Sequence, residues 1–218
     1  EVVKAEYRKR SLIFFFDNIS EDSTINWLQY AIPKACDVDL KQDQYVTLNM
    51  FSGSKLKKQG FKYGDKMPLT KKIKIAKEKS IPFFITGSFN KSADSINVNM
   101  QLYDSKTGKS ILNETFRDAN FFTLIDKITI KIKKGLGLSD THINESIDLP
   151  VAEQFTPSIL ALEYYIKAYI LKEKDDYSAY NVLSLVNKAI KQDPYFSWAY
   201  WTNVGLYFRT NKMDSVEF

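Results

Sequence analysis

The stretch "SLIFFFDNIS", residues 11–20, determines the plan of the chain. Its five consecutive apolar residues, 12–16, show no alternation of apolar and polar positions, which is typical of a strand buried on both faces of a sheet. The run is far shorter than the roughly 18 apolar residues of a membrane-spanning helix. Asp17 and Asn18 then favour a turn. We therefore expect a central strand that other elements cover on both sides.

The composition indicates a folded chain with little metal or redox chemistry. The 218 residues are 44% hydrophobic and 14% aromatic, enough to fill one large core or two small ones. A single cysteine, Cys36, excludes an internal disulfide, and with the single histidine, His142, it offers few zinc ligands. We expect Cys36 to pack as a small apolar residue and His142 to be solvated.

The next segments alternate between helix and strand signals. Apolar residues recur at three and four positions from Ser23 onward, which predicts a helix that Pro33 bends or restarts. The segment "QYVTLNM", residues 44–50, predicts a second strand. Residues 52–65 lack an apolar period and are expected to form an exposed loop, and residues 69–76 favour a short helix.

Three further strands and a helix complete the first half. Residues 82–89, 95–104 and 110–117 are joined by short segments rich in Asn, Asp, Ser and Gly, which predicts an antiparallel meander with one buried and one wet face. Asn120 is a good cap for the following amphipathic helix, and Gly135 is well placed to end it.

The composition changes after residue 138. The segment 139–157 has acids, two prolines and no sustained period, which is typical of a linker. From residue 158 the chain is rich in tyrosine and shows only helical periodicity. The expected organisation is a basic extension (1–10), a mixed-sheet domain (11–138), the linker (139–157) and a helical segment (158–218).

The first half resembles the amino-terminal domain of TolB and related TolB-N-like domains. The likeness is carried by "IAKEKSIPFFITGSF", which closes on Gly87, by the hairpin "VNMQLYDSKTGKSILNETF", and by the first strand, where Phe15 replaces the family's proline. The resemblance implies an α+β fold with a mixed five-stranded sheet and packed helices. It also implies binding to envelope proteins rather than catalysis.

The second half resembles tetratricopeptide (TPR) repeats. Trp201, Val204, Gly205 and Phe208 fit the W-x2-L-G-x2-Y pattern, and Ala189 with Pro194 fits the end of a preceding repeat. The resemblance implies an all-α TPR-type segment. Because about three repeats are needed to bury their apolar faces, we expect the array to continue past this chain.

The TPR resemblance also implies a protein-binding groove. Its lining would be Tyr165, Tyr169, Lys172, Thr202, Leu206 and Arg209. Tyr and Arg are common anchors of protein interfaces. The alternative is that several of these tyrosines only pack between helices.

A lysine-rich stretch, residues 55–79, forms a candidate electrostatic patch. Its members are Lys55, Lys57, Lys58, Lys62, Lys71 and Lys72. Such a run is commonly a solvated face. The alternatives are docking to an acidic protein, peripheral association with an anionic membrane, or binding to nucleic acid.

The sequence offers no catalytic, cofactor or metal site. "SKTGKS" lacks the first glycine of a phosphate-binding loop and precedes a predicted strand, and "GLGL" follows a helix rather than a strand. No acid-base pair or nucleophile constellation stands out. We therefore expect no enzyme, no cofactor and no small-molecule substrate.

The leading hypothesis is a non-enzymatic adaptor of the bacterial cell envelope that binds a partner protein through the TPR groove and the TolB-N-like domain. The expected location is the periplasm, as for a lipoprotein, through a targeting segment that this chain does not contain; the cytoplasm is the alternative. Two other functions stay open: an activator that docks on a peptidoglycan enzyme through the TolB-N-like domain, and a nucleic-acid-binding regulator.

Overall fold

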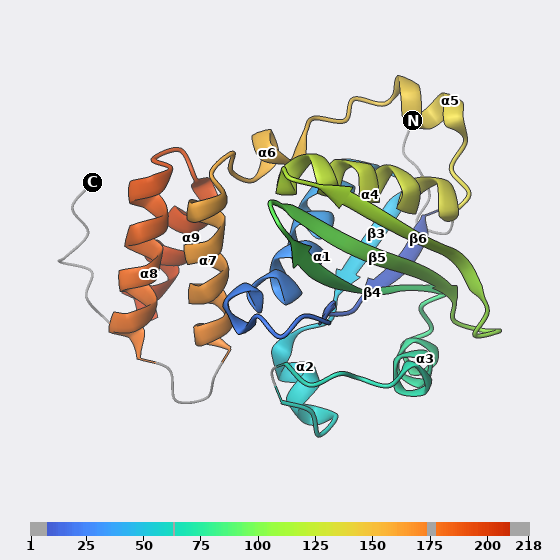
Figure 1. The fold of residues 1–218 in the computed structure, drawn as a ribbon, viewed down its shortest axis with the longest axis horizontal. Helices are drawn as coiled ribbons and strands as arrows, with labels where there is room; N and C mark the ends of the chain where they lie inside the picture. The colour runs from blue at the N-terminus through green and yellow to red at the C-terminus, as the bar shows by residue number, and fades with distance from the viewer. Residues whose placement is uncertain (1–7, 63, 174–177, 210–218) are drawn as a thin grey trace. The chain divides into compact units, whose positions relative to one another are not determined.

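A computed structural model describes residues 8–62, 64–173 and 178–209. The chain divides into two compact units, Glu1–Val151 and Ala152–Phe218. The first unit holds the sheet and the second is helical (Figure 1). Most of the predicted basic extension, residues 1–7, lies outside the described residues, and β1 begins at Lys9.

The first unit is built on a mixed sheet. Its strands are β1 (Lys9–Ile13), β2 (Asp17–Asn18), β3 (Val46–Met50), β4 (Phe83–Ser92), β5 (Ser95–Asp104) and β6 (Ser110–Asp118). The order is β3-β1-β4-β5-β6, with β2 also paired to β4. β1 runs parallel to β3 and β4, whereas β4, β5 and β6 form an antiparallel meander. The predicted fold class and the meander are confirmed; the sixth strand is the short β2 at the predicted turn.

Helices pack around this sheet. They are the 3-10 turn Ser23–Ile25, α1 (Leu28–Leu40), α2 (Gly53–Lys58), α3 (Leu69–Glu78), α4 (Phe121–Gly135) and α5 (Asp140–Glu145), whereas α6 (Val151–Gln154) spans the boundary between the two units. Figure 1 shows α4 laid along the meander, with α2 and α3 on the other side of the sheet. Asn120 caps α4 as predicted, because its side chain accepts hydrogen bonds from two backbone amides.

The predicted central strand is confirmed in part: β1 ends at Ile13, so residues 14–16 follow it, and its last three residues, 11–13, are buried. Leu12 and Phe14 join a core cluster with Leu56 of α2 and Ile75 of α3. Ile13 points to the opposite face, since successive side chains alternate. There it lies level with Ile85 of β4, which in turn pairs with Leu102 of β5. Leu102 packs under α4, where a Cβ on Gly135 would lie 2.8 Å from its side chain.

Pro33 neither ends nor restarts α1, which is continuous from Leu28 to Leu40. A proline has no backbone N–H, so the carbonyl of Gln29, four residues earlier, loses its helical partner. That carbonyl instead accepts a hydrogen bond from the amide of Phe16 (3.3 Å). Because Pro33 has no amide hydrogen, α1 can thus form a hydrogen bond with the segment that follows β1.

The meander buries one face and leaves the other polar, as the alternation predicts. Val98, Met100 and Leu102 are buried, whereas Asn97 and Asn99 are only half-buried. Hydrogen bonds between side-chain amides of neighbouring strands run along the polar face. Asn97 donates to Asn90 (2.9 Å), and Asn99 donates to Asn113 (3.0 Å).

Two local predictions need correction. The predicted exposed loop 52–65 contains α2, because Leu56 inserts into the core; a six-residue helix with one buried large side chain is too short to show a period. α4 ends at Gly135 as predicted, but the left-handed backbone that stops it belongs to Gly137 (φ 83°). Gly135 instead permits close packing on Leu102.

The segment 139–157 holds α5 and α6, and its first part is fastened to the sheet unit. The side chain of Gln42 bonds both the amide and the carbonyl of Leu149. Lys133, itself almost fully buried, pairs with Asp148 (2.8 Å). His142 is not solvated as expected: its Nε2 lies 3.0 Å from a carboxylate oxygen of Asp43.

In the part that the structure describes, the second unit holds most of α6 and three longer helices: α7 (Ile159–Lys172), α8 (Ala179–Gln192) and α9 (Ser197–Arg209). Ser158 and Ser178 cap the first two helices. An aromatic cluster of Phe155, Tyr165 and Phe196 lies in the core. The predicted helical segment is confirmed, while its assignment to TPR repeats stays a prediction.

Gly87 provides a test of the packing between the sheet and the segment after β1. A Cβ at this position would lie 2.3 Å from the carbonyl oxygen of Asn99 and 2.4 Å from the ring of Phe16. We expect Gly87→Ala to lower the free energy of unfolding by about 1–3 kcal/mol or more, as overpacked cores do. Urea denaturation followed by circular dichroism measures this.

The matched control is Gly205→Ala in α9, where a Cβ meets no atom within 4 Å. Because alanine is the better helix former, this substitution should be neutral or stabilising by up to about 1 kcal/mol. Equal effects of the two substitutions would contradict the close approach at Gly87.

Asp39 provides a pH test. Burial raises the pKa of this carboxyl from 3.8 to about 6. The folded protein therefore binds this proton more tightly than the unfolded chain, and the stability gained from it is lost as the pH rises through about 6. We expect Asp39→Asn to raise the free energy of unfolding by about 3 kcal/mol at about pH 8 and to have little effect at about pH 4.

Thermal or urea unfolding at both pH values measures the difference. Asp94→Asn, on the exposed turn between β4 and β5, serves as the control and should change neither value. An equal gain for Asp39→Asn at both pH values would contradict the assignment.

Candidate functional site

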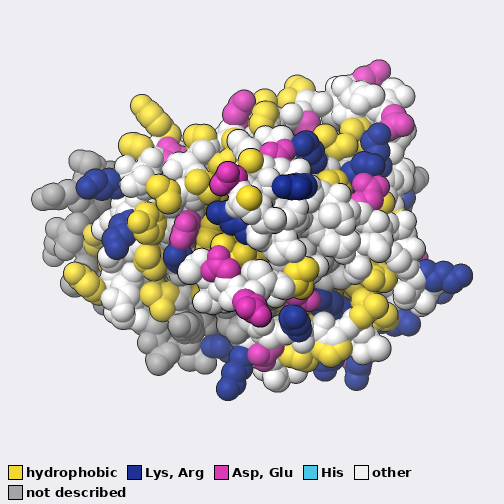
Figure 2. All heavy atoms as spheres, in the orientation of Figure 1, with side chains coloured by type: hydrophobic (Ala, Val, Ile, Leu, Met, Phe, Trp, Pro, Cys, Tyr) yellow, Lys and Arg dark blue, Asp and Glu magenta, His cyan; other side chains and the backbone are white. Residues whose placement is uncertain are grey.

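The predicted lysine patch lies on α2, the loop after it and α3. Lys55, Lys57, Lys58 and Lys62 are exposed, and Lys71 is half-buried. Lysine side chains are prominent along the lower margin of the molecule in Figure 2. The sixth member of the patch does not belong to that surface: Lys72 is only 4% exposed.

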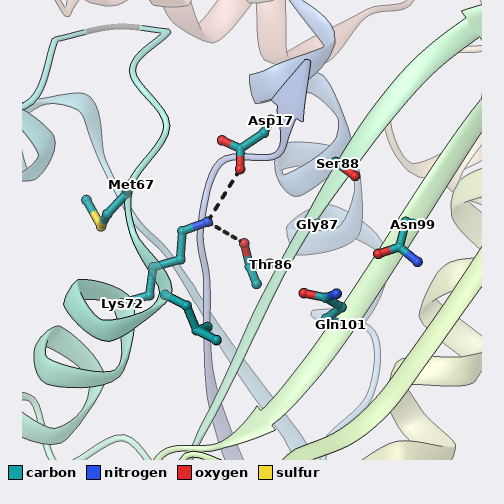
Figure 3. Close-up of a pocket in the computed structure, with 9 residues that line it drawn as sticks. Asp17, Met67, Lys72, Thr86, Gly87, Ser88, Asn99 and Gln101 are labelled. Carbon is teal, nitrogen blue, oxygen red and sulfur yellow. Dashed lines mark hydrogen bonds and ion pairs between the residues drawn. The ribbon is translucent and has the colours of Figure 1, made fainter. Parts of the chain in front are cut away.

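Lys72 points into the sheet unit because it lies on the same side of α3 as the core residues Ile75 and Ala76. Its ammonium donates a hydrogen bond to the hydroxyl of Thr86 (2.6 Å). The nearer carboxylate oxygen of Asp17 is 3.9 Å away. Figure 3 shows the ammonium between these two groups. The helical period of α3 is the sequence signal that indicates the inward position of Lys72. The many neighbouring lysines make that signal hard to recognise.

These residues line a pocket of about 230 Å³ at the end of α3. Its lining is Asp17, Met67, Leu69, Lys72, Thr86, Gly87, Ser88, Asn99 and Gln101. The register of the meander places Thr86 opposite Gln101 and Ser88 opposite Asn99. Two cross-strand pairs of polar side chains therefore form the floor (Figure 3).

Burial and neighbouring charges have opposite effects on the pKa values of Asp17 and Lys72 in the pocket. Burial raises the pKa of Asp17, and the positive charges of Lys72 and Lys66 offset part of that rise. Burial lowers the pKa of Lys72, and Asp17 offsets part of that fall. Each group therefore stabilises the ionised form of the other.

A second hollow, of about 510 Å³, lies in the helical unit on α8. Its lining is Tyr180, Leu183, Ser184, Asn187, Lys188 and Lys191 of α8, with Tyr207 of α9. The α8 members recur at three and four residues and so share one face of the helix. The core residues Val182, Val186 and Ala189 occupy another face.

The six residues predicted to line a TPR groove do not lie together on this hollow. Tyr165 (4% exposed) and Leu206 (1%) are buried in the helical core. Tyr169, Lys172 and Thr202 are half-buried. The side chain of Arg209 lies outside the described residues. None of the five described side chains lines the α8 hollow.

The sequence contains a signal for the α8 hollow that the predicted groove does not use. The residues that the TPR resemblance implies lie on α7 and α9. The polar and aromatic stripe from Tyr180 to Lys191 lies on the intervening helix. Its period of three and four residues is the signal that could have identified it.

Within the described ranges, no group of three or more His, Cys, Asp or Glu residues is arranged to hold a metal ion. In the same ranges, no helix combines the length and apolarity that a bilayer crossing needs. Cys36 is buried, as predicted.

Comparison with known proteins returned no matching family model and no matching curated protein. Solved structures with a similar fold include TolB from Acinetobacter baumannii (17% identity over 60% of this chain and 28% of that chain, TM-score 0.40). They also include the LpoB C-terminal domain from Escherichia coli (17% identity, 53% and 87%, 0.40) and the lipoprotein GNA1162 from Neisseria meningitidis (13%, 58% and 95%, 0.39).

The matched region thus spans little more than a quarter of the TolB chain. The mixed sheet with its packed helices is consistent with a TolB-N-like fold.

The ion pair in the sheet pocket can be tested directly. Removing the ammonium with Lys72→Met removes the attraction that holds down the pKa of Asp17. We therefore expect that pKa to rise further, which a carbon-13 NMR titration of the carboxyl group measures. Lys71→Met, which changes the neighbouring half-buried lysine, should leave it as it was. A pKa of Asp17 that stays constant or falls in Lys72→Met would contradict the pairing.

Proposed function

We propose that the chain is a non-enzymatic protein-interaction adaptor of the bacterial cell envelope. Its helical unit acts as a TPR-type module, and an acidic segment of a partner protein binds in the α8 hollow. The sheet unit is the TolB-N-like domain to which this module is joined. The envelope location rests on the sequence resemblance of the sheet unit alone.

The observation that carries the proposal is the α8 hollow, whose lining includes the aromatic side chains of Tyr180 and Tyr207. Tyr180 lines the hollow and is 79% exposed. Trp201 of α9 is 77% exposed, and Tyr195, in the turn before α9, is 93% exposed. Tyr and Trp are among the side chains most often found as anchors of protein interfaces. Figure 2 shows hydrophobic and cationic side chains side by side on the helical unit.

The charge of the hollow indicates the chemistry of the partner. Its described lining includes two cations, Lys188 and Lys191, and no carboxylate. The ammonium of Lys188 lies 5.8 Å from the ring centre of Tyr164, so it is oriented by a cation–π contact. A segment with carboxylates next to an aromatic or aliphatic side chain complements this surface.

The absence of a recognisable catalytic constellation in the sequence supports a binding role. No observation on the sheet unit favours an activator of a peptidoglycan enzyme over other binding roles. Because the side chain of Lys72 is buried, the patch that a nucleic-acid-binding regulator would use has one cation fewer. The adaptor is therefore the function for which the geometry offers most support.

Selection of a random peptide library on the full chain tests the proposal. We expect the selected peptides to be enriched in Asp and Glu beside aromatic or aliphatic residues. Tyr180→Ala, and the double substitution Lys188→Glu with Lys191→Glu, should each weaken binding of a selected peptide at least about tenfold, which is about 1.4 kcal/mol. Fluorescence anisotropy measures the affinity.

The matched control is Lys55→Glu with Lys58→Glu on α2, which makes the same charge change in the sheet unit. It should leave the affinity nearly unchanged. Selection without acidic enrichment, or equal weakening by both double substitutions, would exclude the α8 hollow as the binding surface.

A further inference from the structure

We propose that the pocket beside Lys72 binds a neutral, polyhydroxylated small ligand of the size of one sugar unit, with one ligand hydroxyl bridging Lys72 and Asp17. This site lies in the sheet unit and is independent of the α8 hollow. It goes beyond the adaptor function, which needs no small ligand.

The first observation is that Lys72 is incompletely bonded. An ammonium has three donors, and a buried charge is costly unless it is paired and hydrogen-bonded. Within the described part of the chain, the hydroxyl of Thr86 is its one hydrogen-bond acceptor. The oxygen of Asp17, at 3.9 Å, is beyond hydrogen-bond distance. The side chain is only 6% exposed, so bulk water does not surround it.

The second observation is the gap between the two charges. An ammonium donates and a carboxylate accepts, so a group that bridges them must accept from one and donate to the other. A hydroxyl does both. A ligand carboxylate would face Asp17, and a ligand ammonium would face Lys72, so either ion would be repelled by one wall. The lining contains one cation and one anion and is therefore suited to a neutral ligand.

The third observation is the floor of amides. The carbonyl oxygen of Gln101 accepts from the hydroxyl of Tyr103 (3.1 Å), which leaves its NH₂ group to donate. The NH₂ group of Asn99 donates to Asn113 and Thr115, which leaves its oxygen to accept. These two groups are two residues apart on β5 and so share a face. A donor and an acceptor side by side match two neighbouring hydroxyls of one ring.

The remaining walls fit the same ligand. Ser88 lies opposite Asn99 on β4 and adds a further hydroxyl. Met67 and Leu69 provide an apolar wall for the C–H face of a ring. The volume of about 230 Å³ is below the roughly 300–1,000 Å³ of pockets for drug-sized ligands. It therefore suits a single ring rather than a long chain.

NMR of the nitrogen-15-labelled full chain tests the site, with glucose and N-acetylglucosamine as probes and acetate and methylammonium as charged comparators. We expect saturable shifts of the backbone amides of Thr86, Ser88, Asn99 and Gln101 with at least one sugar, in the millimolar range that a small contact area permits. No saturable shift with either sugar overturns the proposal. Tighter binding of acetate or methylammonium than of the sugars also overturns it.

Two variants locate the binding. Lys72→Met removes the bridging donor, and Gln101→Leu removes the amide donor while leaving both charges; each should weaken sugar binding at least tenfold. Asn97→Ala is the matched control, since it lies on the same strand and face but outside the pocket lining. Because Gln101→Leu tests the site without disturbing the ion pair, it decides the question if Lys72→Met does not fold. Unchanged binding in the folded variants overturns the proposal.

Discussion

The burial of Leu12, Ile13, Phe14 and Phe16 is the constraint that the sheet unit satisfies. β3 and β4 pair with β1 on its two edges. Helices then cover both faces, with α2 and α3 over Leu12 and Phe14, and α4 over the side to which Ile13 points. Each large side chain that is fully removed from water contributes about 1.5–3 kcal/mol. A single run of five residues therefore accounts for the position of most other elements.

The coverage of the sheet is unequal, and the pocket lies where it stops. Phe84 and Tyr103 are stacked under α3 with ring centres 4.9 Å apart. One pair further along the same face, Thr86 and Gln101 line the pocket. Beyond it the face is polar and open to water: Asn90 and Asn97 are half-buried, and Arg117, which pairs with Asn97, is exposed. The buried Lys72 and the polar floor of the pocket thus lie at the border between two parts of one sheet face, one that helices cover and one that they leave open.

The sequence predicted the features that depend on long or repeated patterns. The unbroken apolar run identified β1, the alternation in residues 95–104 identified the wet and dry faces of the meander, and Asn120 identified the start of α4. It did not predict α2, whose six residues carry no period, or the inward position of Lys72, which depends on where α3 meets the sheet. The α8 hollow has another explanation: the predicted groove residues lie on α7 and α9, and Tyr165, one of the two tyrosines among them, is buried in the helical core.

The hydrogen bond between Phe16 and Gln29 has a consequence for redesign of the scaffold. Proline is the poorest helix former, so replacement of Pro33 by alanine is the first change that a propensity scale would suggest. The new amide at position 33 would then share the carbonyl of Gln29 with Phe16. The substitution would thus make α1 more regular but would weaken the hydrogen bond that holds the segment after β1. In this protein, the least helical residue of a helix keeps a neighbouring segment in register.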